Sequence, residues 1–233
     1  MIRISIIIPV FNEEKTIIKL LEKVNNVNLE GIDKEVIIID DCSTDSTPLL
    51  LEKNKKLFNH LIKLKFNSGK GAAVKQGLLQ ATGKYILFQD ADLEYDPQDY
   101  IKLVEPVLRF NADVVMGSRL SASQLTRVYY FWHKLGNRFI TFAFNVFNNT
   151  TFTDIYSCYL LFRRSLINPN NLETSGWEQQ AEILSKVVAN GKSFYEVPIN
   201  YYGRTYAEGK KIRAHNAISV LLTIFLKKFF PKN

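Results

Sequence analysis

The sequence is poor in cysteine, with only Cys42 and Cys158 among its 233 residues, and these two do not form a CxxC pair. Two isolated thiols exclude the disulfide framework of a small secreted domain. This cysteine usage suits a reducing compartment, and we therefore expect a cytoplasmic protein.

Long hydrophobic runs are also absent. The longest strongly apolar stretch, residues 217–226, has about half the roughly 20 residues that a transmembrane helix needs. The N-terminal segment MIRISIIIPVFNEE has an apolar run too short for a signal peptide, and no small-residue cleavage site follows it. We therefore expect a chain that begins with a β-strand and does not span a membrane.

Several sequence signatures are missing as well. The chain has neither the GxGxxG of dinucleotide enzymes nor the Walker A GxxxxGK[ST] of P-loop ATPases. Its net charge of +7 indicates anionic partners, such as nucleic acid, an anionic membrane surface or phosphorylated substrates. Lysine and arginine are spread along the chain, however, and no zinc-finger, RNP or helix-turn-helix signature is present, so we expect no nucleic-acid partner.

No repeat or Gly/Ser linker divides the chain, and we expect one domain over residues 1–233. From residue 2 to residue 119, strand-like and helix-like segments alternate. The strand-like segments are residues 4–10, 34–40, 60–66, 84–90 and 112–118, and the helix-like segments are residues 12–26, 46–57, 70–83 and 97–110. Several strands are apolar on both faces, which predicts an α/β fold with an open, mostly parallel sheet flanked by helices.

Local signals predict where some helices begin and end. Asn12 can cap a helix that holds Glu13 and Glu14 in its first turn. Gly83 stands where a helix end favours a left-handed residue, and Asp96-Pro97 has the form of an N-cap followed by the first helical position. These signals agree with the alternating pattern.

Polar residues follow three of the predicted strands, at Asn12-Glu13, Asp40-Asp41 and Asp90-Asp92. In open α/β sheets, ligands bind beyond the carboxyl ends of the strands. We therefore expect these residues to meet at a ligand site.

The third of these groups, in QDADLEYDP, suggests a metal site. Asp90, Asp92 and Glu94 alternate with other residues, and an extended backbone would place such side chains on one face. They offer only hard oxygen ligands, with no His or Cys nearby, which favours Mg²⁺ or Mn²⁺. The alternative is a capped and solvated turn.

The second half differs in character. Residues 128–147 are rich in aromatics and are typical of an amphipathic helix with a wide apolar face. For this helix, core packing and a membrane interface both stay open. Residues 212–230 combine an apolar run with basic residues and paired aromatics, which favours binding at a membrane surface.

Seven segments of the chain occur in an order that is typical of a known enzyme family. They are SIIIPVFNEE, IIIDDCSTDST, NSGKGAAVKQG, QDADLEYDP, VVMGSRL, TDIYSCYLLFRR and EVPINYYGRTYAEGKKI. Together they resemble the family 2 glycosyltransferases with the GT-A fold, particularly the branch that includes dolichyl-phosphate mannose and glucose synthases. The resemblance implies a metal-dependent, inverting transfer of mannose or glucose from a nucleotide diphosphate sugar, such as GDP-mannose or UDP-glucose.

The resemblance also implies roles on the donor side. Pro9, Phe11 and Glu13 match residues that line the nucleotide pocket, with the acid reaching the ribose hydroxyls. Asp41 matches a residue that contacts the base through a charge-assisted hydrogen bond. Lys70 lies between two glycines in a segment that resembles the part beneath the donor diphosphate, although a tight turn would also explain the glycines.

Asp90 and Asp92 match the DxD pair that holds the divalent cation across the donor diphosphate. Glu94 occupies a position that often completes the metal site in the polyprenyl-phosphate branch. The cation, Mg²⁺ or Mn²⁺, offsets the charge that builds on the departing nucleoside diphosphate. Asp90 thus counts as a donor-binding, metal-binding and catalytic residue.

For the acceptor, the resemblance implies dolichyl or undecaprenyl phosphate at the cytoplasmic membrane face. Arg119 and Arg127 resemble basic residues that hold the acceptor phosphate, and Arg suits bidentate phosphate recognition. Arg204, Lys210 and Lys211 resemble a later basic patch. The alternative for the two lysines is a solvated, charged loop.

Two other reactions stay open. A lipid phosphate is already an anion, whereas a hydroxyl acceptor on a glycan or lipid-linked sugar needs a general base. Asp154 matches a family acid beside the acceptor site, and Glu178 is a second candidate, although either could be a cap or a surface acid. A sugar-phosphate nucleotidyltransferase is a distant alternative, but that class normally has a glycine-rich loop where this chain has PVFNEE.

The chain departs from the family pattern in two ways. Many relatives have transmembrane helices after the catalytic domain, whereas we expect none in this sequence, and we expect interfacial segments or an integral membrane partner to reach a lipid acceptor. Residues 213–216, RAHN, replace a W-x-D-G-like run of many close relatives. We assign residues 1–119 to nucleotide-sugar binding and residues 120–233 to acceptor binding with interfacial helices.

Overall fold

The computed structural model describes residues 1–121, 131–203 and 216–230. The strands in this part of the chain are β1 (Ile2–Val10), β2 (Ile32–Asp40), β3 (His60–Lys63), β4 (Tyr85–Phe88), β5 (Val114–Ser118), β6 (Leu160–Arg163) and β7 (Phe194–Pro198). The α-helices are α1 (Ile17–Asn26), α2 (Thr47–Lys53), α3 (Lys70–Gln80), α4 (Tyr100–Phe110), α5 (Phe131–Asn148), α6 (Gln179–Asn190) and α7 (Asn216–Phe229). The alternation predicted for the first half is confirmed.

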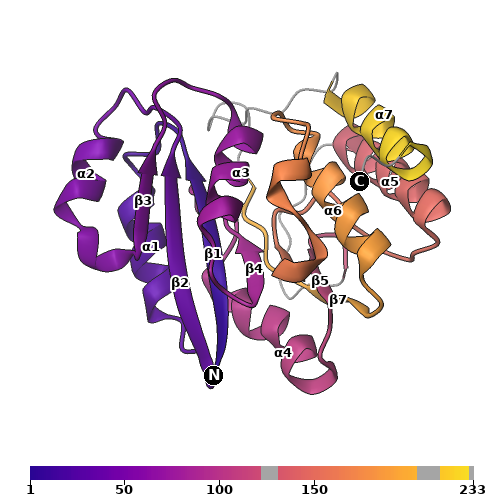
Figure 1. Ribbon diagram of the computed structural model, residues 1–233, viewed down its shortest axis with the longest axis horizontal. Coiled ribbons are helices and arrows are strands. Elements are labelled where there is room, and N and C mark those ends of the chain that lie inside the picture. Colours follow the sequence, from indigo (N-terminus) through magenta and orange to yellow (C-terminus); the bar gives the residue numbers. More distant parts are fainter. Residues whose placement is uncertain (122–130, 204–215, 231–233) are drawn as a thin grey trace.

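The strands form one sheet in the order β3-β2-β1-β4-β6-β5-β7 (Figure 1). β1 pairs in parallel with β2 and β4, whereas β6 runs antiparallel between β4 and β5. The predicted α/β fold with an open, mostly parallel sheet is therefore confirmed. Strands from both predicted halves join this sheet, and the division into a donor half and an acceptor half stays a prediction.

The strand order places helices on both faces of the sheet. β1, β2 and β3 follow one another in one direction, and the chain then crosses back to β4 on the other side of β1. Because crossovers between parallel strands are right-handed, α1 and α2 lie on one face and α3 lies on the other, against β1 and β2. Open sheets of this type bind ligands at such a reversal point, here between β1 and β4.

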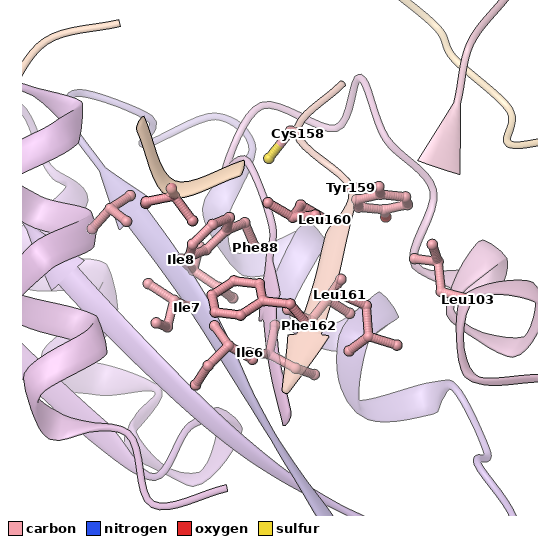
Figure 2. Close-up of a cluster of buried hydrophobic side chains, with 14 of the residues drawn as sticks. Ile6, Ile7, Ile8, Phe88, Leu103, Cys158, Tyr159, Leu160, Leu161 and Phe162 are labelled. Carbon is pink, nitrogen blue, oxygen red and sulfur yellow. The ribbon is translucent and has the colours of Figure 1, made fainter. Parts of the chain in front are cut away.

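The core lies around β1, β4 and β6. Ile6, Ile7 and Ile8 are completely buried, and Figure 2 shows them beside Phe88 and the side chains of β6. The rings of Phe88 and Phe162 lie with their centroids 5.6 Å apart. Three consecutive buried residues on one strand are expected where both faces of the sheet are covered by helices.

One helix-start signal is confirmed and another is wrong. Asp96 accepts a backbone hydrogen bond at 3.2 Å and caps the short 3-10 helix that leads into α4. Asn12 does not cap α1, which begins only at Ile17. Its φ of +54° turns the chain, and its Oδ1 accepts a hydrogen bond from the N–H of Thr44 at 2.8 Å. A contact between the loops after β1 and β2 thus replaces the local cap.

Gly83 is required by close packing, not by the left-handed conformation that the sequence suggests, since its φ is not positive. A Cβ at this position would lie 2.6 Å from the backbone nitrogen of Ser5 and 3.0 Å from the carbonyl oxygen of Arg3. The Gly83 N–H donates to Ser5 Oγ at 2.8 Å. The turn before β4 approaches β1 this closely because no side chain intervenes.

The two segments expected to be amphipathic are helical. α5 and α7 pack against each other at one end of the molecule (Figure 1). Val220 and Ile224 of α7 are buried, while many other apolar side chains of the two helices are exposed. Within the described residues, no helix is both long enough and apolar enough to cross a membrane.

The close approach at Gly83 can be tested by adding a single methyl group. We expect Gly83→Ala to lower the free energy of unfolding by about 1–3 kcal/mol, because the backbone of β1 must shift. The control is Gly136→Ala within α5, where an added Cβ meets nothing within 4 Å. That change should raise stability by about 0.5–1 kcal/mol. Urea unfolding followed by circular dichroism measures both, and equal stabilities for the two variants would contradict the packing argument.

Candidate active site

A cavity of about 410 Å³ opens beyond the carboxyl ends of β1 and β4, where the strand order reverses. Every residue expected to bind the donor lines it: Pro9, Phe11, Glu13, Asp41, Lys70 and Asp90. Asp92, Glu94 and Arg119 line it as well. The structure therefore brings the predicted donor and metal residues and one predicted acceptor residue around one space, while their individual roles stay predictions.

Asp41 shapes one wall of the cavity. Its carboxylate accepts hydrogen bonds from the N–H groups of Ser68 and Gly69, at 2.7 and 2.9 Å, and the residue is buried. These bonds join the end of β2 to the loop that enters α3. Both oxygens of Asp41 thus position the start of α3, and a contact with the base stays a prediction.

Two glycines let the chain fold tightly at the start of α3. Gly69 has a φ of +89°, in the region that favours glycine. At Gly71, a Cβ would collide with the backbone of Ser175. The loop before α6 therefore lies directly on the first turn of α3, where the N–H groups of the helix have no partners within the helix.

Lys70, the first residue of α3, is ion-paired with Asp90 at the end of β4. Its Nζ also lies 5.6 Å from the ring centroid of Trp177. Burial lowers the pKa of the Lys70 ammonium, but the Asp90 carboxylate acts against burial together with neighbouring groups, and this pKa lies above its usual value. Lys70 is therefore positively charged at neutral pH.

The acids after β4 lie on a turn rather than on the extended backbone that was predicted. β4 ends at Phe88, Leu93 has a φ of +63°, and Asp92 Oδ1 accepts a hydrogen bond from the N–H of Glu94 at 3.1 Å. Glu94 in turn accepts a hydrogen bond from the hydroxyl of Tyr201 at 2.7 Å. Across residues 1–121, 131–203 and 216–230, no three acidic, His or Cys side chains are close enough to form a preassembled metal site. That these acids bind a metal stays a prediction.

Arg119 and Asp154 form a buried bidentate ion pair. Arg119 Nε donates to Oδ2 at 2.7 Å and Nη2 donates to Oδ1 at 2.8 Å, and the backbone N–H adds a third bond of 3.0 Å. Burial lowers the pKa of the guanidinium, but Asp154 acts against burial together with neighbouring groups, and this pKa lies above its usual value. Asp154 itself is completely buried and does not line the cavity. The geometry gives it the role of holding Arg119, and its role as a base stays a prediction.

The remaining predicted residues do not line the cavity or lie outside the described part of the chain. Glu178 precedes α6, where its Oε1 accepts a hydrogen bond from the N–H of Gly176 at 3.3 Å. It is half-buried and does not line the cavity. The predicted acceptor residues Arg127, Arg204, Lys210 and Lys211 lie outside the described residues.

Sequence reasoning missed an aromatic wall. The rings of Tyr95 and Tyr201 lie with their centroids 5.1 Å apart, and the guanidinium of Arg119 lies 5.1 Å from the centroid of Tyr201. Burial raises the pKa of both tyrosines and of the neighbouring Cys158 thiol, so these three side chains are uncharged at neutral pH. Tyr95 directly follows the acidic run, but that position alone does not indicate a contact with residue 201.

The sequence of this chain is similar to known proteins. Residues 5–169 match the family model described as Glycosyl transferase family 2. MJ1222 of Methanocaldococcus jannaschii is 26% identical over 230 residues, which cover 97% of this chain and 93% of that protein. Agl6 of Haloferax volcanii, named a low-salt glycan biosynthesis hexosyltransferase, is 28% identical over 202 residues, which cover 86% of this chain and 48% of that protein. This chain thus spans about half the length of Agl6.

Solved structures share the fold. Glucosyl-3-phosphoglycerate synthase from Mycobacterium tuberculosis, solved with Mn²⁺, UDP and phosphoglyceric acid, superposes with a TM-score of 0.71 at 18% identity, covering 100% of this chain and 80% of that chain. Residues 1–349 of TarS from S. aureus, solved with UDP, superpose with a TM-score of 0.66 at 20% identity, covering 98% of this chain and 67% of that chain. Since the family match extends over most of the sheet and over the acids after β4, the chain belongs to glycosyl transferase family 2 and is a glycosyltransferase with the GT-A fold.

Proposed function

We propose that this glycosyltransferase moves a hexose, with inversion, from a nucleotide diphosphate sugar to a polyprenyl phosphate. One observation carries the proposal: a single cavity whose lining combines Lys70, Asp90 and Asp92 with Arg119, which Asp154 holds in place. These are groups that bind a diphosphate, a divalent cation and a second anion.

On the donor side, the first turn of α3 and the charged Lys70 attract a diphosphate. Glu13 offers a carboxylate to the ribose hydroxyls, and Asp41 lies beside the base. Some of the solved structures with this fold contain uridine nucleotides: UDP in the mycobacterial synthase, and UDP or UDP-GlcNAc in TarS. This supports a UDP-hexose, such as UDP-glucose, over GDP-mannose.

Mg²⁺ or Mn²⁺ fits the acids at the end of β4. Such ions are commonly held by one or two carboxylates together with substrate phosphates, a mode that needs no preassembled group of three acids. Asp90 and Asp92, with Glu94 beside them, offer only oxygen ligands and line the same cavity. When bound, the cation supplies Lewis-acid stabilisation of the leaving diphosphate. The Mn²⁺ in the mycobacterial synthase supports this assignment.

On the acceptor side, Arg119 binds the phosphate of the lipid. A phosphate oxygen attacks the anomeric carbon, the bond from that carbon to the diphosphate breaks, and its electron pair leaves with the nucleoside diphosphate. No proton has to be removed, because the attacking oxygen is already an anion. Both oxygens of Asp154 are occupied by Arg119, which favours an anionic acceptor over a sugar hydroxyl. The other residues that we assign to phosphate binding are Arg127, Arg204, Lys210 and Lys211.

The lipid acceptor is reached through the exposed apolar face of α5 and α7. This face includes Phe131, Trp132, Phe139 and Phe142 of α5, with Ile218, Leu222 and Phe229 of α7. Neither helix contains Asp or Glu, and α5 carries the exposed basic residues Lys134 and Arg138. Two helices that present apolar and basic side chains but contain no Asp or Glu suit an anionic membrane surface. We therefore place the enzyme peripherally on the cytoplasmic face of a membrane, alone or with an integral membrane partner.

The proposed reaction is tested with a panel of UDP- and GDP-hexoses and a short polyprenyl phosphate. We expect glycolipid formation that EDTA abolishes and that Mg²⁺ or Mn²⁺ restores. Asp92→Asn should lower the rate roughly a hundredfold, because charge on the leaving group loses its stabilisation. Asp33→Asn is the control, since Asp33 forms a surface ion pair with Arg3 near the N-terminal ends of β1 and β2, away from the cavity.

Failure of this assay would be informative. If donors bind but no glycolipid forms from any of them, the polyprenyl-phosphate acceptor is wrong. Glycans and lipid-linked sugars then become the acceptors to test. Release of pyrophosphate from a nucleoside triphosphate and a sugar phosphate would instead support the nucleotidyltransferase alternative.

Kinetics separate the two roles considered for Asp154. Arg119→Lys keeps the charge but loses the bidentate fork, so we expect the KM for polyprenyl phosphate to rise roughly tenfold with the donor KM unchanged. Asp154→Asn should raise the same KM and leave the shape of the pH–rate profile unaltered, because it loosens Arg119. Loss of the acidic limb of that profile in Asp154→Asn would show that Asp154 is the general base.

Vesicle sedimentation tests the membrane face. The protein should bind vesicles with anionic lipids more tightly than neutral vesicles, and salt should weaken this binding. Leu222→Ser should weaken it roughly fivefold, since a half-exposed leucine loses about 1 kcal/mol of burial. Leu49→Ser in α2, at the other end of the sheet, removes a similarly exposed leucine and should change nothing. An equal effect of both substitutions would contradict the assignment of this face.

A further inference from the structure

The segment of residues 173–177, between β6 and α6, forms part of the wall of the cavity. The backbone of Ser175 lies against Gly71 in the first turn of α3. Trp177 lines the cavity and lies beside the ammonium of Lys70. The position of this segment therefore decides how closely the wall approaches the proposed diphosphate site.

A buried carboxylate holds this segment in place. Glu182 of α6 is completely buried. Its oxygens accept hydrogen bonds from the N–H and hydroxyl of Thr174, at 2.9 and 2.6 Å, and from the N–H of Glu173 at 3.2 Å. Glu182 thus fixes Glu173 and Thr174, the first two residues of the segment, although it does not line the cavity itself.

The cation that balances Glu182 comes from α7. Lys227 Nζ lies 3.1 Å from Glu182 and 2.8 Å from Glu173, and its side chain is only 9% exposed. The ammonium of Lys186, also on α6, lies farther from Glu182, at 4.0 Å. α7 therefore reaches the segment through one lysine, while most of its outer face is apolar.

The charge states agree with this geometry. Burial raises the pKa of Glu182, but hydrogen bonds from Thr174 and Lys227 outweigh burial and lower it below the usual value. Burial lowers the pKa of Lys227, but Glu173 and Glu182 raise it above the usual value. Both partners are charged at neutral pH, and removing Lys227 would leave the buried Glu182 with the weaker ion pair to Lys186, at 4.0 Å, among the described residues.

We propose that Lys227 is a positioning residue for donor binding: through Glu182 and Glu173 it holds residues 173–177 over the donor site, and so links the helix that faces the membrane to the cavity. The effect on nucleotide affinity rests on the proposed function of the cavity, whereas the effect on the segment itself does not. A lysine on α7 thereby acts on a site that its own side chain does not touch.

Tryptophan fluorescence reports the position of the segment directly. The chain has two tryptophans, so Trp132→Phe leaves Trp177 as the single probe. In this background we compare Lys227→Met with Lys228→Met, which removes the same charge from the next residue of α7, an exposed one. Lys227→Met should roughly double the acrylamide quenching of Trp177, because the segment opens more often. Lys228→Met should leave quenching unchanged.

UDP titration of the same proteins, without lipid, measures the effect on the donor site. Lys227→Met should raise the Kd for UDP about tenfold, and Lys228→Met should not change it. Lys227→Arg should restore both readouts because it keeps a cation beside Glu182. Glu173→Gln removes only the more exposed partner of Lys227 and should have an intermediate effect, which keeps the test open if Lys227→Met fails to fold.

The outcomes separate this proposal from the proposed function. Equal quenching of Trp177 in Lys227→Met and Lys228→Met would overturn the positioning role, whatever the cavity binds. Increased quenching with an unchanged Kd for UDP would overturn the link to donor binding. If no variant and no wild-type protein binds any nucleotide, while quenching still rises only in Lys227→Met, the donor assignment fails and the positioning of the segment by Lys227 stands.

Discussion

The parallel pairing of β1 with β2 on one side and β4 on the other is the constraint on which the rest of the site depends. Because of this pairing, the carboxyl ends of β1, β2 and β4 lie at the same edge of the sheet. Asp41, Asp90 and the start of α3 therefore meet although they are far apart in the sequence. The close packing of Gly83 on Ser5 fixes how β4 enters this arrangement, at the opposite end of the strand.

The fold and the meeting of six residues around one cavity were predictable from the sequence, because both depend on patterns within short segments, while the donor roles of these residues stay predictions. Apolar strands that end in polar residues identified β1, β2 and β4, and the six donor residues proved to line one cavity. Predictions failed where a distant partner outweighs local preference. Asn12 bonds to Thr44 instead of capping α1, and Asp92 bonds within a turn that an extended strand would not form.

The surroundings of Arg119, a predicted acceptor residue, were harder to predict because they depend on contacts between side chains that are far apart in the sequence. The sequence indicated Arg119 and Asp154 separately, as an anion-binding residue and a possible base. Neither position reveals that the two side chains join in one buried ion pair. The same holds for Lys227 and Glu182, and for Tyr95 and Tyr201, since each pair joins elements that are distant in the sequence. Such pairs determine which charges are left to face a substrate.

The insertion of β6 between β4 and β5 also has a consequence for how the protein is made. β1, β2, β3 and β4 can pair with one another as they emerge from the ribosome. This pairing already brings together the carboxyl ends of β2 and β4, which Asp41 and Asp90 follow. β5 pairs only with β6 and β7, both of which are synthesised later. Until β6 appears, the outer edge of β4 and the whole of β5 have no strand partner, and unpaired apolar strands of this kind are open to wrong pairing. The nascent chain is thus most vulnerable after β5 has emerged from the ribosome and before β6 has emerged.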